Sequence, residues 1–390
     1  MLNFEFWNGT KLYFGKGVEE RAGELVKENA KSVLVCYYGT PSTIELVENT
    51  FKSLDENGIE YKKLSGIKPN PELAKVYEGI NLVRENDLEF ILAIGGGSII
   101  DTAKAIAAGA PYEGDVWDLY DKQLGFQDAI PLGVILTFPA AGSESSNGSV
   151  ITNEDTQQKL AIIDNCLRPV FALLDPELTY KLPAFQTFCG IADIMSHVME
   201  RYFSATKNTD LTDKLCEAVL RSVKHNALLL LNDPADYNAR AEIMLASTIA
   251  HNDLLGVGRT QDWASHNMGM VISGIYNSTH GATLSVITPA WAKYIYKNNI
   301  ARFAQFATRV FDIEYDFNAP ENTALEGILA LESFFKRIGI PTTLEELGIP
   351  DDSNFEEMAD KYEQGGTAGD IVKIQGEDFI NILKLARAGN

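Results

Sequence analysis

Short apolar runs alternate with amphipathic segments through the first 180 residues, and this alternation restricts the fold more than any other feature of the chain. The runs at 32–38, 90–94, 132–136 and 170–174 are rich in apolar and β-branched residues, which is typical of strands buried in a parallel sheet. A further strand is predicted at 60–64. Helical patterns extend through Leu54 and from about Pro71 to Asn86. Strands that alternate with helices in this way predict a doubly wound α/β domain.

The pattern changes after Leu182. Helical periodicity dominates the segments 213–231, 238–254, 299–310 and 324–338, and strand patterns nearly disappear. Pro183 and the preceding segment 175–178 mark the junction. Because 390 residues exceed what one hydrophobic core usually serves, we predict an α/β domain over residues 1–181 and an all-helical domain over residues 182–390.

Three consecutive glycines, Gly95–Gly97, directly follow the predicted strand at 90–94 and open a helical pattern. Glycines let backbone N–H groups approach a pyrophosphate, and the N-terminus of the following helix favours its negative charge. A tight strand–helix turn without a ligand is the alternative on this evidence. A second loop, 137–144, follows the next strand, and 38–42 follows the first. Ligands of open α/β sheets bind beyond the carboxyl ends of strands, so these loops are expected to border one crevice.

Asp193 and His197 lie one helical turn apart if their segment, 190–200, is a helix. A carboxylate and an imidazole on one face can bind the same cation, although such pairs also arise by chance. The chain has five histidines, and His266 and His280 lie downstream in candidate ligand positions. One Asp and three His with open coordination positions would form a catalytic rather than a closed structural metal site.

Composition excludes several classes of protein. The net charge of −21 argues against nucleic acid or an anionic membrane as the partner. The four cysteines are widely spaced, with neither a zinc-ribbon spacing nor a disulfide framework, so reduced thiols in a cytoplasmic protein are expected. No signal peptide is visible at the N-terminus, and no apolar run is long enough to cross a membrane.

Several ordered motifs together resemble the iron-containing (group III) alcohol dehydrogenases, in particular the branch of NADPH-dependent butanol dehydrogenases and aldehyde reductases. The resemblance extends over nearly the whole chain. Its motifs are Gly95–Gly97 with Ser98 and Asp101, Gly142–Ser143–Glu144, the segment 174–178, Gly190-x-x-Asp193-x-x-x-His197, His266, His280–Gly281, and the segment 342–348.

This resemblance implies a Rossmann-like N-terminal domain and a helical C-terminal domain, the dehydroquinate synthase-like fold, with cofactor and metal between them. Asp193, His197, His266 and His280 are the expected ligands of one Fe²⁺ or Zn²⁺ and form the catalytic set. The resemblance also implies a homodimer in the cytoplasm that acts on a small aldehyde or alcohol. The expected residues for binding NADP(H) are Gly39, Thr40, Ser42, Gly95, Gly96, Gly97, Ser98, Asp101, Thr137, Ser143 and Lys159.

Two positions depart from the family pattern. Met270 stands where members often carry a further histidine proposed to relay a proton, so water or a ribose hydroxyl would have to serve. Ala141 replaces a threonine that many members carry, which removes one possible hydroxyl contact with the cofactor. His225 and His251 are interpreted as structural, and Trp263 as either a wall of the substrate pocket or a core residue.

The loop after the first predicted strand carries no carboxylate from Tyr38 until Glu45. In NAD-preferring relatives an Asp stands near the position of Gly39, where it would repel the 2′-phosphate of NADP. We therefore predict that NADPH is preferred. The expected activity is a metal-dependent alcohol dehydrogenase acting on substrates such as butanol and butanal. The alternatives are a polyol (glycerol-type) dehydrogenase, a lyase like dehydroquinate synthase, and a catalytically silent protein that binds metal and nucleotide.

Overall fold

The computed structural model describes residues 1–126, 128–351 and 353–388, and the chain divides into two compact units. One unit is Trp7–Leu182. The other consists of Met1–Phe6 and the chain from Pro183 onward. The first six residues group with the second unit because the amide of Leu2 donates to the carbonyl of Gly258 at 2.8 Å and the N-terminal ammonium to that of Lys207 at 2.8 Å. The domain boundary expected from the sequence places these six residues in the first domain instead.

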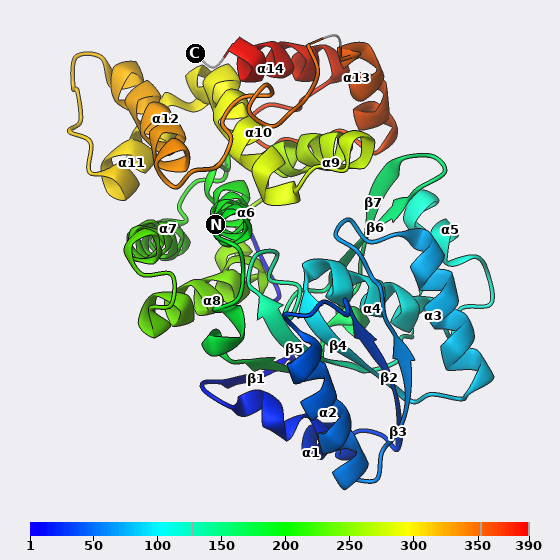
Figure 1. Ribbon diagram of the computed structural model, residues 1–390. Coiled ribbons are helices and arrows are strands. Elements are labelled where there is room, and N and C mark those ends of the chain that lie inside the picture. The colour runs from blue at the N-terminus through cyan, green and yellow to red at the C-terminus, as the bar shows by residue number, and fades with distance from the viewer. Residues whose placement is uncertain (127, 352, 389–390) are drawn as a thin grey trace. The chain divides into compact units, whose positions relative to one another are not determined.

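The first unit contains a parallel sheet with the strand order β1-β8-β5-β4-β2-β3. The strands are β1 (Lys11–Phe14), β2 (Ser32–Tyr37), β3 (Glu60–Leu64), β4 (Phe90–Gly96), β5 (Leu132–Phe138) and β8 (Phe171–Leu174). The helices around it are α1 (Ala22–Lys27), α2 (Ile44–Glu56), α3 (Leu73–Glu85), α4 (Gly97–Gly109) and α5 (Val116–Asp121) (Figure 1). Short 3-10 turns lie at Val18–Arg21, Asn165–Leu167 and Pro176–Thr179.

Helices cover both faces of this sheet. Val33, Val35 and Leu92 pack against α1 and α2 in one buried cluster. Side chains alternate along a strand, so Leu34 and Ile91 face the opposite side, where they are equally buried. There α3 and α4 pack against each other and α4 contacts β4. Burial on both faces explains why the central strands are continuous apolar runs.

The strand order reverses between β2 and β4. The chain leaves β2 through α2 to reach β3 on one side, whereas it leaves β4 through α4 and continues to β5 on the other. In open α/β sheets such a reversal opens a crevice at the carboxyl ends of the two strands. The loop 38–43 follows β2. Gly95 and Gly96 close β4 and Gly97 starts α4, and these three residues are called the glycine loop. The topology therefore brings both predicted cofactor segments to this reversal.

Three strands were not predicted from the sequence. β1 is a four-residue edge strand paired only with β8, and three of its four residues are exposed, so it lacks a long apolar run. β6 (Gly148–Asn153) and β7 (Gln158–Ile163) form a separate antiparallel hairpin. Their half-buried positions mix polar side chains, such as Gln158 and Lys159, with apolar ones, such as Val150 and Leu160, which hides a strand pattern.

The second unit is helical, with no strand among its described residues. Its helices are α6 (Ala184–Tyr202), α7 (Asp210–Asn232), α8 (Tyr237–His251), α9 (Ala264–Tyr276), α10 (His280–Ile295), α11 (Ile300–Phe311), α12 (Pro320–Arg337), α13 (Phe355–Gln364) and α14 (Gly376–Ala388), with 3-10 turns at Leu254–Gly256 and Tyr296–Asn299. Within the described ranges, no helix combines the length and apolar character that a membrane crossing requires.

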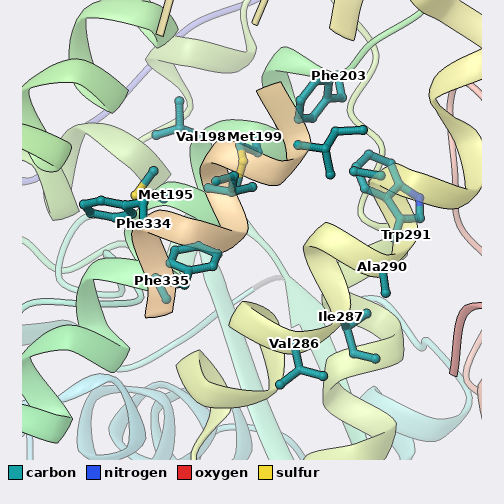
Figure 2. Close-up of a cluster of buried hydrophobic side chains, with 14 of the residues drawn as sticks. Met195, Val198, Met199, Phe203, Val286, Ile287, Ala290, Trp291, Phe334 and Phe335 are labelled. Carbon is teal, nitrogen blue, oxygen red and sulfur yellow. The ribbon is translucent and has the colours of Figure 1, made fainter. Parts of the chain in front are cut away.

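Helix α6 lies in the core of this unit. Its residues Met195, Val198 and Met199 belong to a buried cluster that also includes Ile287 and Trp291 of α10 (Figure 2). At about 100° per residue, these three residues of α6 fall about 140–240° around the helix from Asp193. The apolar face of α6 therefore points away from its polar face, which leaves the polar face for chemistry.

Candidate functional site

The polar face of α6 presents Asp193, His197 and Glu200. With about 100° per residue, His197 and Glu200 fall within about 40° of Asp193 on either side. All three are buried, at 4%, 4% and 2% exposure. A buried row of ionisable groups is costly unless its members are paired or bind a metal. The prediction that segment 190–200 is helical is confirmed.

Glu200 fixes the orientation of His266, which lies in the first turn of α9. Its Oε1 accepts hydrogen bonds from His266 Nδ1 at 2.8 Å, from the His266 amide at 2.9 Å and from Ser265 Oγ at 2.6 Å. A carboxylate only accepts, so Nδ1 carries a proton, and in the neutral imidazole Nε2 is the nitrogen with the free lone pair. This is the arrangement by which a carboxylate orients a metal-binding histidine.

His280 is the first residue of α10, and Gly281 allows that helix to approach α6 closely. A Cβ at Gly281 would lie 2.0 Å from the carbonyl oxygen of Cys189 in α6. Only glycine permits this approach of the two backbones. This packing explains why a glycine follows His280: it lets the start of α10 approach α6 and so brings the histidine to the polar face of α6.

Asp193, His266 and His280 form a cluster whose ligand atoms all lie within 4.8 Å of one another. Asp193 Oδ1 is 3.7 Å from His266 Nε2 and 3.9 Å from His280 Nε2. Ligand atoms bound to one ion at about 2.1 Å lie at most about 4.2 Å apart. Both Asp193 Oδ1 and His266 Nε2 are buried without a hydrogen-bond partner among the described residues. Their geometry and donor chemistry fit one divalent cation.

His197 lies beside this cluster but is not part of it. Its Nδ1 is 3.0 Å from the backbone carbonyl of Asp193 and 3.1 Å from Asp193 Oδ1, and its ring centroid is 4.4 Å from that of His266. Of the four predicted ligands, three are thus brought together as a group, and His197 contacts the carboxylate of one of them. Its role as a ligand stays a prediction.

The charges of the cluster are strongly coupled. Burial alone would raise the pKa of Asp193, but His197, His266 and His280 outweigh it and hold that pKa well below its usual value. Burial would also lower the pKa of His266, yet the neighbouring carboxylates of Asp193 and Glu200 raise it overall. The carboxylates are therefore anionic at neutral pH, which suits a site for a cation.

Sequence reasoning missed two residues around this site. No function was predicted for Glu200, although its spacing of seven residues from Asp193 places both on one helix face. His251, interpreted as a structural histidine without a partner motif, has its ring centroid 4.3 Å from that of His197. It lies at the end of α8, and no local motif links it to α6. Trp263 is half-buried and packs edge-on against His266, with ring centroids 5.2 Å apart.

The glycine loop of the first unit joins β4 to α4 without an intervening segment. No side chain among the described residues caps the N-terminus of α4, so its amides suit an anion. A Cβ at Gly96 would lie 2.8 Å from Phe138 Cβ, and one at Gly97 3.2 Å from Ala141 Cβ. Close packing against Phe138 of β5 is therefore one reason for a glycine at position 96. An approach of the backbone to a phosphate would be a second reason.

Asp101 braces the second loop from α4. Its Oδ1 accepts from Ser143 Oγ at 2.5 Å and its Oδ2 from the amide of Val150 at 3.1 Å. Both carboxylate oxygens thus have partners inside the protein, which supports a bracing role for Asp101. Its direct contact with the cofactor, expected from the sequence, stays a prediction. Thr137 is buried at the end of β5. Lys159, on β7, donates to Asn70 Oδ1 at 2.8 Å.

The loop after β2 exposes small residues. Gly39 has φ +83°, a left-handed conformation that favours glycine. Thr40 Oγ1 lies 3.0 Å from Ser42 Oγ and 3.0 Å from Thr43 Oγ1, so these hydroxyls form one cluster. Helix α2 starts next, at Ile44, without a side-chain cap.

Residues 9–176 match the family of iron-containing alcohol dehydrogenases, and residues 187–387 match the C-terminal part of the same family. The probable NADH-dependent butanol dehydrogenase 1 of Bacillus subtilis is 40% identical over 385 residues, which span 98% of this chain and 99% of that protein. The NADPH-dependent aldehyde reductase of Escherichia coli is 33% identical over 369 residues, 94% of each chain.

The crystal structure of NADH-dependent butanol dehydrogenase A from Thermotoga maritima superposes with a TM-score of 0.95 at 36% identity and covers 99% of both chains. The predicted fold class, a Rossmann-like N-terminal domain followed by a helical C-terminal domain, is confirmed. With its extent and its degree of identity, the match establishes that the chain belongs to the iron-containing alcohol dehydrogenase family.

Proposed function

We propose that this protein is a metal-dependent dehydrogenase that interconverts small aliphatic aldehydes and alcohols with a nicotinamide cofactor. The buried cluster of Asp193, His266 and His280, with two ligand atoms that lack a hydrogen-bond partner among the described residues, is the observation that carries the proposal. The relatives named above are butanol dehydrogenases and an aldehyde reductase. A polyol dehydrogenase receives less support from them.

In this proposal Asp193, His266 and His280, with His197, hold one Fe²⁺ or Zn²⁺. When bound, the ion acts as a Lewis acid on the oxygen of the aldehyde or alcohol. Glu200 keeps the proton on Nδ1 of His266, so that Nε2 remains available as a ligand. Asp193 and Glu200 supply negative charge in a site from which most water is excluded, which strengthens the attraction of a cation.

The first unit would bind the cofactor. The uncapped N-terminus of α4 and the glycines before it would hold the pyrophosphate, and Ser143 would lie on the nicotinamide side. The reduced nicotinamide supplies the hydride, and the aldehyde takes up one proton to become the alcohol. Because Met270 replaces the relay histidine found in many members, water or a ribose hydroxyl would deliver that proton.

We also propose a homodimer, which sedimentation velocity tests.

We further propose that NADPH is preferred over NADH, since no carboxylate lies between Tyr38 and Glu45. The hydroxyls of Thr40 and Ser42 and the uncapped N-terminus of α2 would receive the 2′-phosphate. The names of the relatives are divided on this point, because the Bacillus subtilis protein is called NADH-dependent and the Escherichia coli protein NADPH-dependent.

The substitution Gly39→Asp tests this preference, with Gly39→Asn as its control. Asp and Asn are both tolerated comparatively well at positive φ, so the two variants share any backbone strain and differ in charge. A like charge about 4 Å away costs about 1–4 kcal/mol near a surface. The Asp variant should therefore shift the ratio of kcat/KM toward NADH by about fivefold or more relative to Asn. Equal values for both cofactors in the unmutated protein would refute the preference.

The activity itself is tested with butanal and reduced cofactor, by following the loss of nicotinamide absorbance before and after treatment with a chelator. We expect turnover that stops on chelation and returns when Fe²⁺ or Zn²⁺ is restored. A protein that binds metal and nucleotide without catalysis would show binding of both and no loss of absorbance. That result across a panel of aldehydes and alcohols would overturn the proposal.

A further inference from the structure

The segment Gly142–Ser149 is buried although its composition, rich in serine and glycine, is that of a flexible surface loop. Ser143, Ser145, Ser146 and Ser149 are exposed by only 3%, 1%, 3% and 0%. Buried polar groups of this kind require hydrogen-bond partners. The partners come largely from α4, the helix that begins at the glycine loop.

Two successive turns of α4 hold this segment. Asp101 accepts from Ser143 Oγ and from the amide of Val150, while its own carbonyl accepts from Ser149 Oγ at 2.8 Å. One turn later, Lys104 Nζ donates to the carbonyl of Ser146 at 2.8 Å, to its Oγ at 3.2 Å and to the carbonyl of Gly148 at 2.9 Å. An ammonium has three N–H donors, and each has an acceptor here.

Lys104 is completely buried, at 0% exposure. Removing an ammonium from water costs several kcal/mol, and a packed apolar side chain in its place is often neutral or stabilising. Fold stability alone therefore gives no reason for a lysine at this position. The ammonium does, however, fix two carbonyls of the segment relative to α4. Ala141, the residue directly before the segment, lies beside Gly97 of the glycine loop.

We propose that Lys104 is a positioning residue for the nicotinamide cofactor. It locks the segment Gly142–Ser149 to α4, so that the N-terminus of α4 and Ser143 keep the spacing that the bound cofactor requires. Lys104 does not touch the cofactor itself in this account. The inference rests on the proposed function, because it assumes that the cofactor binds along α4 and this segment.

The test compares Lys104→Met with the unmutated protein. Methionine fills similar volume but donates nothing to the carbonyls of Ser146 and Gly148. Reduced-cofactor Kd, measured by fluorescence titration, and cofactor KM should rise about tenfold, which corresponds to about 1.4 kcal/mol. The KM for butanal and the metal content should stay unchanged.

Lys293→Met is the matched control. Lys293 is also largely buried, with 11% side-chain exposure, and pairs with Glu332 at 2.6 Å in the helical unit. This variant should lose thermal stability without any change in cofactor Kd. If Lys104→Met does not fold, Lys104→Gln replaces it, since its amide keeps two of the three donors, and its Kd should rise by a smaller factor.

An unchanged cofactor Kd in a folded Lys104 variant would overturn the positioning role while leaving the proposed function intact. A wild-type protein that binds neither NADPH nor NADH would overturn both. An equal rise in Kd for the Lys293 and Lys104 variants would also overturn the role, because it would reduce the effect to general destabilisation.

Discussion

The substitution Gly281→Ala tests whether the approach of α10 to α6 builds the metal cluster. Real Cβ atoms essentially never come closer than 3.0 Å to another atom, whereas an alanine Cβ here would lie 2.0 Å from the carbonyl of Cys189. This carbonyl oxygen belongs to the backbone of α6, so a rotamer change cannot relieve the clash. The start of α10 must therefore retreat by at least about 1 Å in a tightly packed interior.

That movement has a larger effect on metal binding than on folding. His280 Nε2 is already 3.9 Å from Asp193 Oδ1, near the limit of about 4.2 Å for two ligands of one ion. A further 1 Å would break the shared coordination. Metal affinity should fall by about 10–100-fold or more, as it does when supporting contacts of a metal site are lost. The free energy of unfolding should fall by about 1–3 kcal/mol, the usual effect of overpacking.

The assay is a competition between protein and a chromophoric chelator, with chemical denaturation in parallel. Gly327→Ala is the control, because its Cβ would lie 2.5 Å from Ala307 Cβ and 2.8 Å from Ala307 Cα, where α12 packs on α11. It should lose similar stability but keep wild-type metal affinity. If Gly281→Ala retains wild-type affinity, or if both variants lose metal equally, the account of α10 is wrong.

Three further predictions concern single groups. Glu200→Gln should lower metal affinity about 10–100-fold, measured by the same competition, because an amide oxygen accepts from His266 Nδ1 more weakly than a carboxylate and brings no negative charge to the site; wild-type affinity would contradict that role. Metal affinity should rise with pH through the raised pKa of His266, since the ion must displace a proton from it; binding titrations that show no proton release would count against His266 as a ligand. Burial lowers the pKa of Lys104 to about 8 from 10.5, so between these pH values the unfolded chain holds a proton that the folded chain lacks. Its contribution to the free energy of unfolding should rise with pH across this window, by up to about 3 kcal/mol, and denaturation series should lose that rise in Lys104→Met.

The sequence predicted the central strands and most helices because burial leaves a strong periodic pattern. Phe90–Ile94 carries only apolar residues since both faces of β4 are covered, and α6 shows its apolar and polar faces in its spacing. The edge strand β1 and the hairpin β6–β7 were missed because partial exposure mixes polar residues into short strands. Helix boundaries also shifted, as at α7, which begins at Asp210 rather than Asp213.

The metal candidates were predictable because Asp193 and His197 share one helix face and His266 and His280 lie in matching motifs. Contacts between distant helices left no comparable pattern. His251 approaches His197 across the gap between α8 and α6, and nothing near either residue in the sequence indicates it. Asp101 braces the loop beside α4, and its predicted contact with the cofactor is a separate role that spacing alone does not distinguish from bracing.

Metal reconstitution tests whether catalysis depends on one ion bound at Asp193, His266 and His280. The protein is stripped with a chelator and titrated anaerobically with Fe²⁺ or Zn²⁺, while bound metal and butanal reduction are measured on the same samples. We expect activity to rise in proportion to bound metal and to level off at one ion per chain, with no high-affinity binding in the His266→Ala variant. Full activity in the stripped protein, or unchanged metal binding in that variant, would contradict the claim.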